Sequence, residues 1–303
     1  MVDITNKTST LRIATAQAVV KVSTPATIEA IKKGTVPKGD VLAMSKAAGL
    51  LGVKKTPDLL PDCHPLPIEY TNIAYKISDL EIQVSVTIKT IYKTGVEVEA
   101  MHGASIVALN MYDMLKPIDK GIEIHHIKLI DKKGGKSDYT DTFRSDIQAA
   151  VVVCSDTISA GKKEDKAGKA IISKLKKCNV EILNYAIIPD EVATIQQKAK
   201  HYQSQGADII IYTGGTGLSK RDVTPEALQP LLDRTIPGVE EAIRKYGQDR
   251  MPYAMLSRSV VGTIENTLVL ALPGSTNGAK ESMEAIFPEI LHVFRILKGA
   301  RHD

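Results

Sequence analysis

The stretch ADIIIYTGGTGLSKRDVTPEAL, residues 207–228, decides how the second half of the chain folds. It begins with an almost continuous apolar run, which is typical of a strand covered on both faces of a parallel sheet. Gly214, Gly215, Thr216 and Gly217 follow at once, and glycines let successive N–H groups turn toward an anion. Open α/β sheets bind ligands where their strands end, so we expect a binding loop here. For the four residues alone, a simple tight turn is an equal alternative.

The residues around this stretch alternate between apolar strands and amphipathic helices. Strands are predicted over 147–154, 180–188, 207–213 and 268–272, and helices over 163–177, 193–205 and 278–298, with two more starting at Pro225 and Gly238. Such alternation is typical of parallel sheets. We therefore expect an α/β, Rossmann-like, mainly parallel-sheet domain.

Two carboxylates follow predicted strand ends in this half. Asp222 lies on the loop before Pro225, and Asp190 lies just past residue 188. Carboxylates beside a phosphate loop can hold Mg²⁺. Taken alone, Asp190 is more simply explained as the N-cap of the helix that starts near Ala193. Ser275 marks a third strand exit, in Leu-Pro-Gly-Ser.

The first half has more strands and shorter helices, which indicates an α+β domain. Helices are predicted over 25–34, 40–51 (with Asp40 as cap) and 100–116. Strands are predicted over 73–92, bent near residue 78, and over 95–99 and 122–130, with a basic loop over 131–138.

Four places in the first half carry candidate functional side chains. Prolines fix the backbone around Cys63 and His64. On the predicted strand 95–99, Glu97 and Glu99 would share a face. Asp113 and Lys116 are helix neighbours, for which an ordinary salt bridge is the simpler explanation. Lys132 lies in a glycine-containing loop that could hold a phosphate or could simply be a solvated turn.

Length and composition limit the alternatives. A chain of 303 residues fits two domains, which we place at 1–140 and 147–303, with a polar linker over 141–146. The net charge of +4 and the scarcity of aromatic residues argue against a nucleic-acid partner and favour small anionic substrates. The N-terminus lacks signal-peptide features, and no apolar run approaches about 18 residues, so no membrane partner is expected. Three widely spaced cysteines favour the cytoplasm.

The second half resembles the MogA/MoaB family. The resemblance rests on SDT (155–157), IPDE (188–191), TGGTGLSKRDVTPE (213–226), MLSRSVVG (255–262) and LPGSTNGAKESME (272–284). It implies adenylylation of molybdopterin, with ATP and Mg²⁺ giving molybdopterin-AMP and pyrophosphate. It places Asp190 and Asp222 at the metal and in catalysis, residues 214–217 on the phosphate and pterin, and Ser275 and Glu281 on the last binding loop. Some relatives with these motifs are not thought to adenylylate, so a non-catalytic pterin-binding or assembly module is the alternative.

The first half resembles the cyclic pyranopterin monophosphate synthases, the MoaC family. The resemblance rests on residues 1–14, 38–42, 48–68, 93–101, 108–116 and 132–138, and one departure is Asp62, where the family usually has leucine. It implies a ferredoxin-like fold, a homo-oligomer (hexameric or trimer-based) with sites across subunit interfaces, and conversion of 3',8-cyclo-7,8-dihydroguanosine triphosphate to cyclic pyranopterin monophosphate and pyrophosphate. The implied site residues are Lys38, Cys63, His64, Glu97, Glu99, Asp113, Lys116 and Lys132.

In that chemistry Asp113 and Lys116 would exchange protons, which suggests a lowered pKa for the lysine. Both halves point independently to the same pathway, and their pterin and nucleotide substrates are small molecules.

Overall fold

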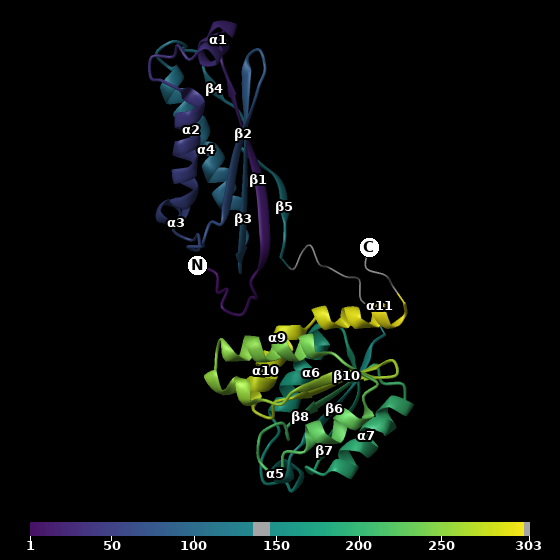
Figure 1. The fold of residues 1–303 in the computed structure, drawn as a ribbon. Coiled ribbons are helices and arrows are strands. Elements are labelled where there is room, and N and C mark those ends of the chain that lie inside the picture. Colours follow the sequence, from purple (N-terminus) through teal and green to yellow (C-terminus); the bar gives the residue numbers. More distant parts are fainter. Residues whose placement is uncertain (136–145, 300–303) are drawn as a thin grey trace. The chain divides into compact units, whose positions relative to one another are not determined.

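The computed structural model describes residues 1–135 and 146–299, and the chain divides into two compact units, Met1–Thr140 and Asp141–Asp303 (Figure 1). Each unit has its own hydrophobic core. Most of the expected linker, 141–145, and the end of the basic loop, 136–138, lie outside the described residues.

The first unit is built on an antiparallel sheet around β1 (Thr10–Lys21). This strand pairs along its whole length with β3 (Glu81–Tyr92), and on its other side with β4 (Glu123–Ile124) and β5 (Lys128–Lys133). β2 (Tyr70–Ile77) completes the order β2–β3–β1–β4. Alternate residues of β1 and β3 are buried, as expected for a sheet with one covered face.

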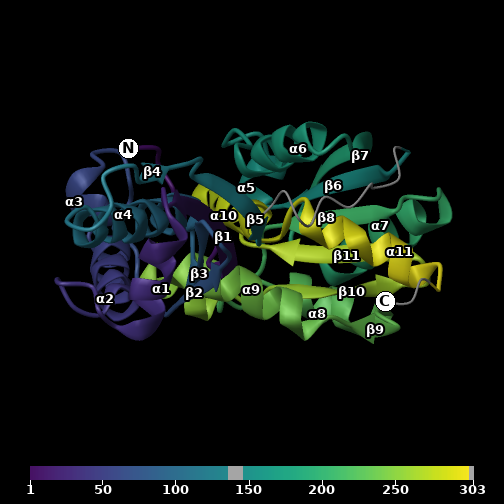
Figure 2. The same ribbon diagram turned by 90° about the horizontal axis from the view of Figure 1, so that it is seen from above.

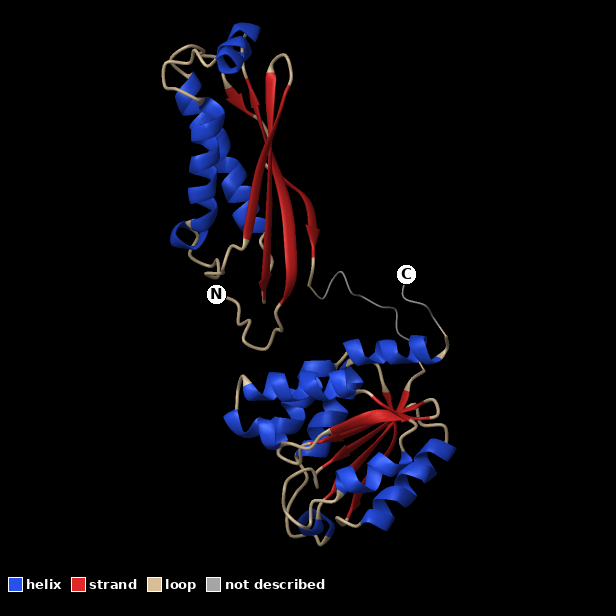
Figure 3. Cartoon of the chain, viewed as in Figure 1, coloured by secondary structure: helices blue, strands red, loops and turns tan. Residues whose placement is uncertain are grey.

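Two long helices cover that face, α2 (Val41–Lys54) and α4 (Glu97–Leu115), as Figure 3 shows. They pack closely enough that a Cβ on Gly103 of α4 would overlap the Val53 side chain of α2. Short helices α1 (Pro25–Lys33) and α3 (Thr56–Leu59) flank them. Asp40 caps α2 as predicted, because its carboxylate accepts a hydrogen bond from the Ala43 N–H at 2.9 Å.

The strand predictions for this unit need three corrections. Residues 73–92 form a hairpin, β2 and β3, that turns where a bend in one strand was expected. The predicted strand 122–130 is divided into β4 and β5, and β5 continues to Lys133. Residues 97–99 are helical, because the apolar pattern of α4 extends back through its acidic first turn, where negative charge favours the helix. Glu97 and Glu99 therefore do not share a strand face. The long strand β1 is missing from the sequence prediction.

The second unit contains a six-stranded sheet in the order β7–β6–β8–β11–β10–β9. The four strands β7 (Glu181–Ile188), β6 (Gln148–Cys154), β8 (Ile209–Thr213) and β11 (Thr267–Leu272) are parallel. β10 (Val260–Ile264) and the short β9 (Arg234–Thr235) are antiparallel and were not predicted. The expected mainly parallel α/β sheet is confirmed, and Figure 2 shows its strands side by side.

Helices cover both faces of this sheet. One face packs against α6 (Ala167–Lys177), α9 (Pro237–Gln248) and α10 (Thr276–Ile286). The other face packs against α7 (Val192–Ser204) and α8 (Thr224–Leu228). The closing helix predicted over 278–298 is instead divided into α10, a 3₁₀ turn η3 (Glu289–His292) and α11 (Val293–Leu297), because Pro288 lacks the N–H that a continuing helix needs.

In the part of the chain that the structure describes, the longest apolar helices fall short of what crossing a membrane requires.

Candidate functional site

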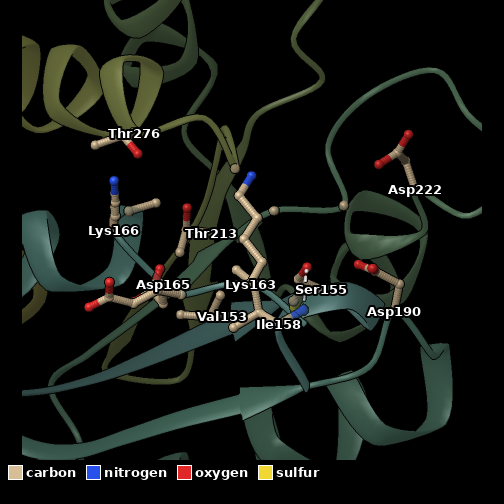
Figure 4. A pocket seen from close by; sticks show the side chains of 16 residues that line it. Val153, Ser155, Ile158, Lys163, Asp165, Lys166, Asp190, Thr213, Asp222 and Thr276 are labelled. Atoms are coloured by element: carbon tan, nitrogen blue, oxygen red, sulfur yellow. Dashed lines mark hydrogen bonds between the residues drawn. The ribbon is translucent and has the colours of Figure 1, made fainter. Parts of the chain in front are cut away.

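A pocket opens at the carboxyl ends of β6 and β8 in the second unit (Figure 4). Parallel strands end together at this edge, so loops far apart in the sequence meet there. The lining residues are Val153, Cys154, Ser155, Ile158, Lys163, Glu164, Asp165, Lys166, Ala167, Asp190, Thr213, Gly214, Gly215, Asp222, Gly274 and Thr276. The structure thus brings together two of the predicted loop glycines and both predicted carboxylates.

The glycine loop is closed by Thr224. Its hydroxyl donates to the Gly214 carbonyl at 2.9 Å, and its N–H donates to the Gly215 carbonyl at 3.0 Å. Gly215 has φ +63°, and a Cβ there would overlap the Thr224 hydroxyl and lie 2.8 Å from Asp190 Oδ1. Only glycine therefore allows the loop to pass so close to the carboxylate.

Asp190 carries a buried oxygen that is free to bind something else. Its Oδ2 accepts a hydrogen bond from the Asp156 N–H at 3.2 Å, and its own N–H donates to Asp156 Oδ1 at 3.1 Å. Nothing among the described residues donates to Oδ1, which is buried. Burial raises the pKa of the Asp190 carboxyl, and the nearby Asp156 and Asp222 carboxylates raise it further. The alternative N-cap role is wrong, since Glu191 occupies that position in α7.

Asp222 lies on the same side of the pocket as Asp190, whereas Lys166 lies on the other side near Asp165, and Lys163 lies between the two sides, as Figure 4 shows. Asp222 Oδ2 accepts from the Ser219 N–H at 2.9 Å, which holds the carboxylate within its own loop. The pocket therefore combines a pair of carboxylates suited to a hard cation with two lysines that can contact phosphate, and Glu164 and Asp165 line it beside those lysines. An orphan carboxylate oxygen beside a second carboxylate fits Mg²⁺.

Four other predicted residues of this half are not among those lining the pocket. Thr216 is buried, and Gly217 lies against Asp222, where a Cβ would approach Oδ2 to 2.9 Å. Ser275 caps α10 by accepting a hydrogen bond from the Gly278 N–H at 3.1 Å. Glu281 was expected on a binding loop, but it lies within α10 and faces Gly247 of α9. The expectation that Glu281 lies on the last binding loop is therefore wrong.

Two polar residues next to residues that line the pocket, Asp156 and Arg221, were not singled out from the sequence. Asp156 forms an ion pair with Arg221, and the hydrogen bond from that arginine lowers the pKa of the Asp156 carboxyl. Both residues lie inside the quoted motifs, but the pairing joins positions 65 apart in the sequence.

In the first unit, one group of predicted residues gathers around Asp113 near the C-terminal end of α4. Lys38 Nζ lies 2.6 Å from Asp113 Oδ2, and Lys116 Nζ lies 2.8 Å from Oδ1. Hydrogen bonds from Lys116 and Lys38 lower the pKa of Asp113 to about 2. The same contact raises the pKa of Lys116, so the expected lowering is wrong: the lysine is a solvent-accessible cation paired with a carboxylate.

A second group gathers at the other end of α4. Cys63 Sγ donates to Glu99 Oε1 at 3.1 Å, and Lys132 Nζ lies 3.5 Å from Glu97 Oε1. His64 Nε2 lies 2.8 Å from the Val2 carbonyl oxygen. Burial, followed by the contact with Glu99, raises the pKa of Cys63 to about 12, and burial raises the pKa of Glu99. The unusual Asp62 next to them is almost fully exposed and pairs with the Met1 amino group at 3.0 Å.

These two groups are far apart within one chain. Asp113 lies fourteen positions after Glu99 along α4, which at about 1.5 Å per residue is roughly 21 Å. The groups are called the Asp113 cluster (Lys38, Asp113 and Lys116) and the Glu99 cluster (Cys63, His64, Glu97, Glu99 and Lys132) below. No metal-binding group of three or more His, Cys, Asp or Glu side chains occurs within residues 1–135 and 146–299.

Comparison with known proteins assigns each unit. Residues 1–135 match the MoaC family, and residues 150–292 match the probable molybdopterin binding domain. The cyclic pyranopterin monophosphate synthase of Clostridium perfringens is 48% identical over 45% of this chain and 87% of its own length. A solved structure, that of the molybdopterin biosynthesis enzyme MoaB from Thermus thermophilus, is 37% identical and covers 52% of this chain and 99% of its own, with a TM-score of 0.48.

Other relatives span both units. The molybdenum cofactor biosynthesis bifunctional protein of Chlorobaculum tepidum is 39% identical over all of this chain and 96% of its own length. The chain therefore belongs to the family of molybdenum cofactor biosynthesis bifunctional proteins.

Proposed function

We propose that each unit catalyses one step of molybdenum cofactor biosynthesis. The first unit converts 3',8-cyclo-7,8-dihydroguanosine triphosphate to cyclic pyranopterin monophosphate and pyrophosphate. The second adenylylates molybdopterin with Mg-ATP. The first assignment is supported by the MoaC-family match and by the similarity to a cyclic pyranopterin monophosphate synthase. The second is supported most directly by the unpartnered oxygen of Asp190 in the pocket.

In the second unit, the chain's own residues would bind and orient the two substrates. Lys163 and Lys166 and the amides of the glycine loop bind the phosphates, and Asp190 and Asp222 would hold Mg²⁺. When bound, Mg²⁺ neutralises the charge that develops on the phosphates during transfer. Phosphoryl-type transfer depends mainly on positioning and charge neutralisation, so the pocket needs no protein nucleophile. The cation would also relieve the repulsion that raises the pKa of Asp190.

The test is a product assay with the whole chain. Purified protein is incubated with molybdopterin, Mg²⁺ and ATP, and molybdopterin-AMP and pyrophosphate are measured. We expect both products from the wild type and neither from Asp222→Ala. If the wild type still forms cyclic pyranopterin monophosphate but yields no molybdopterin-AMP, the second unit has only a binding or assembly role.

In the first unit, the lysines of both clusters would neutralise the triphosphate and the departing pyrophosphate. The low pKa of Asp113 keeps it a carboxylate at neutral pH, so it can accept hydrogen bonds and orient the lysines beside it. Lys116 is a cation at that pH and acts as the donor. The element order, with two helices crossing one antiparallel sheet, supports the ferredoxin-like assignment.

We also infer that the first unit works as a homo-oligomer. A single substrate of nucleotide size cannot touch both clusters of one chain across roughly 21 Å of helix. A symmetric interface would instead bring the Asp113 cluster of one copy beside the Glu99 cluster of another.

A further inference from the structure

Arg258 holds the loop that carries Asp222. It lies between the 3₁₀ turn η2 (Pro252–Leu256) and β10, outside the pocket lining. Its Nε donates to the Gly217 carbonyl at 2.8 Å, and its Nη2 donates to the Asp222 carbonyl at 2.7 Å. Its Nη1 pairs with the Glu226 carboxylate, and its backbone N–H donates to the Thr216 carbonyl at 3.0 Å. All four contacts go to residues 216–226.

Apart from Arg258, the side chain that joins the exposed part of this loop to another strand end is Arg221, which pairs with Asp156. Residues 218–221 are exposed, so apolar burial contributes little there. Within the loop, the Asp222 N–H donates to the Ser219 carbonyl at 2.9 Å, and Ser219 donates back to the Asp222 carboxylate. These bonds shape the turn but do not tie it to the sheet. Arg258 ties the loop to the sheet, because its own backbone leads directly into β10.

The geometry suits an arginine and no other side chain. A guanidinium is planar and carries its donors in a rigid fork, so it can bind two carbonyls and a carboxylate at once. A lysine has one ammonium on a flexible stem and cannot span the same three acceptors. The Arg258 side chain is only 31% exposed, so a loop carbonyl that lost its donor would be partly desolvated.

We propose that Arg258 is a positioning residue: it fixes the loop so that the Asp222 carboxylate stays on the same side of the pocket as Asp190. Its catalytic importance rests on the proposed function of the second unit, in which Asp222 is a metal ligand. The set of contacts from Arg258 to residues 216–226, called the clamp below, exists in the protein without substrate and can be measured separately.

The test compares full-length Arg258→Lys with the wild type and with Arg244→Gln. Arg244 is a matched control because it is equally exposed, at 31%, but it pairs with Glu240 within α9. Hydrogen exchange is followed without ligand at two amides, Asp222 N–H and Thr224 N–H, both of which are hydrogen-bonded within the loop. The Mg²⁺ concentration that gives half the maximal rate of adenylyl transfer is measured in parallel.

We expect exchange at these amides to become about 10-fold faster in Arg258→Lys. We expect the half-maximal Mg²⁺ concentration to rise by about 10- to 100-fold, as for other residues that orient metal ligands. Arg244→Gln should leave both unchanged. Glu226→Ala removes one of the acceptors, so it should change the exchange rates and the half-maximal Mg²⁺ concentration in the same direction but by less. This variant replaces Arg258→Lys in the test if Arg258→Lys does not fold.

Wild-type exchange at Asp222 and Thr224 in both Arg258→Lys and Glu226→Ala would overturn the clamp. Faster exchange with an unchanged Mg²⁺ dependence would overturn its role in placing Asp222. If the wild type shows no adenylyl transfer, the proposed function is overturned instead. The hydrogen-exchange rates alone would then show whether Arg258 holds the loop.

Discussion

In the second unit the candidate site is formed by neighbouring parallel strand ends, whereas in the first unit the expected site residues lie at the two ends of one helix. Loops after β6, β7 and β8 place Asp156, Asp190 and Asp222 around one pocket. The Asp113 and Glu99 clusters are separated by most of α4. A parallel sheet collects loops at one edge, so one chain can complete a site there. A long helix on an antiparallel sheet spreads its polar ends, which is why we propose that a second copy completes the site of the first unit.

The largest effect should follow from Asp190→Asn. The amide has nearly the same shape but lacks the negative charge, so we expect adenylyl transfer to fall by about 100-fold or more. The free energy of unfolding should instead rise. Because burial raises the pKa of Asp190, its charged form is disfavoured in the fold at neutral pH, and a neutral side chain relieves that cost. Thermal unfolding and initial rates measure the two effects. Asp249→Asn, at the exposed C-cap of α9, is the control. Parallel losses of stability and rate in Asp190→Asn would count against this account.

The contrast between the units is tested by mixing two variants of the first unit. Lys116→Ala lies in the Asp113 cluster and Lys132→Ala in the Glu99 cluster, and both side chains are about half exposed, so folding should survive. Each variant alone should lose synthase activity. In a randomly mixed dimer population, half of the dimers contain both variants and have one intact site of two, so about a quarter of the activity should return. If mixing restores nothing while the variants do exchange subunits, each chain carries its own site and the contrast fails.

Gly215→Ala should show how tightly the pocket of the second unit is built. The substitution combines a positive φ with overlap at Thr224, so the free energy of unfolding should fall by about 1–3 kcal/mol. Gly161→Ala is the matched control, since Gly161 has φ +71° but open space around its Cβ position. It should cost only the strain of the positive φ, about 1 kcal/mol. Denaturant unfolding compares the two, and equal losses would show that the overlap is relieved without cost.

The smallest effect concerns the chemistry of the Glu99 cluster. Because the pKa of Cys63 is raised to about 12, the protein should hold this thiol protonated at neutral pH. Alkylation of Cys63 should therefore stay slow up to pH 9 and accelerate only above it. Burial is the largest cause of the raised thiol pKa and would remain in Glu99→Gln, but this variant removes the contribution of the Glu99 carboxylate, so alkylation should accelerate at somewhat lower pH. Mass mapping of the Cys63 peptide reads the rate, and ordinary thiol reactivity at pH 8 would contradict the geometry.

Local patterns were enough to predict much of the second unit. Apolar strand runs and glycine-rich strand exits predicted β6, β8 and β11 and the carboxylates of the pocket, because these features depend on neighbours in the sequence. The same reasoning predicted the cap at Asp40. It failed at Glu97, where spacing by two suggested a strand, although the longer apolar pattern of α4 makes the segment helical.

By itself, the sequence determined the two-part organisation, the mainly parallel sheet of the second unit and the residue types available for phosphate and cation binding. Only the tertiary structure decided which of these residues meet. It separated the two clusters along α4, moved Glu281 away from the pocket and placed Arg258 on the Asp222 loop, 36 positions away in the sequence. The physical reason is that periodicity and capping act over a few residues, whereas these contacts form only when sheet pairing and helix packing bring distant segments together.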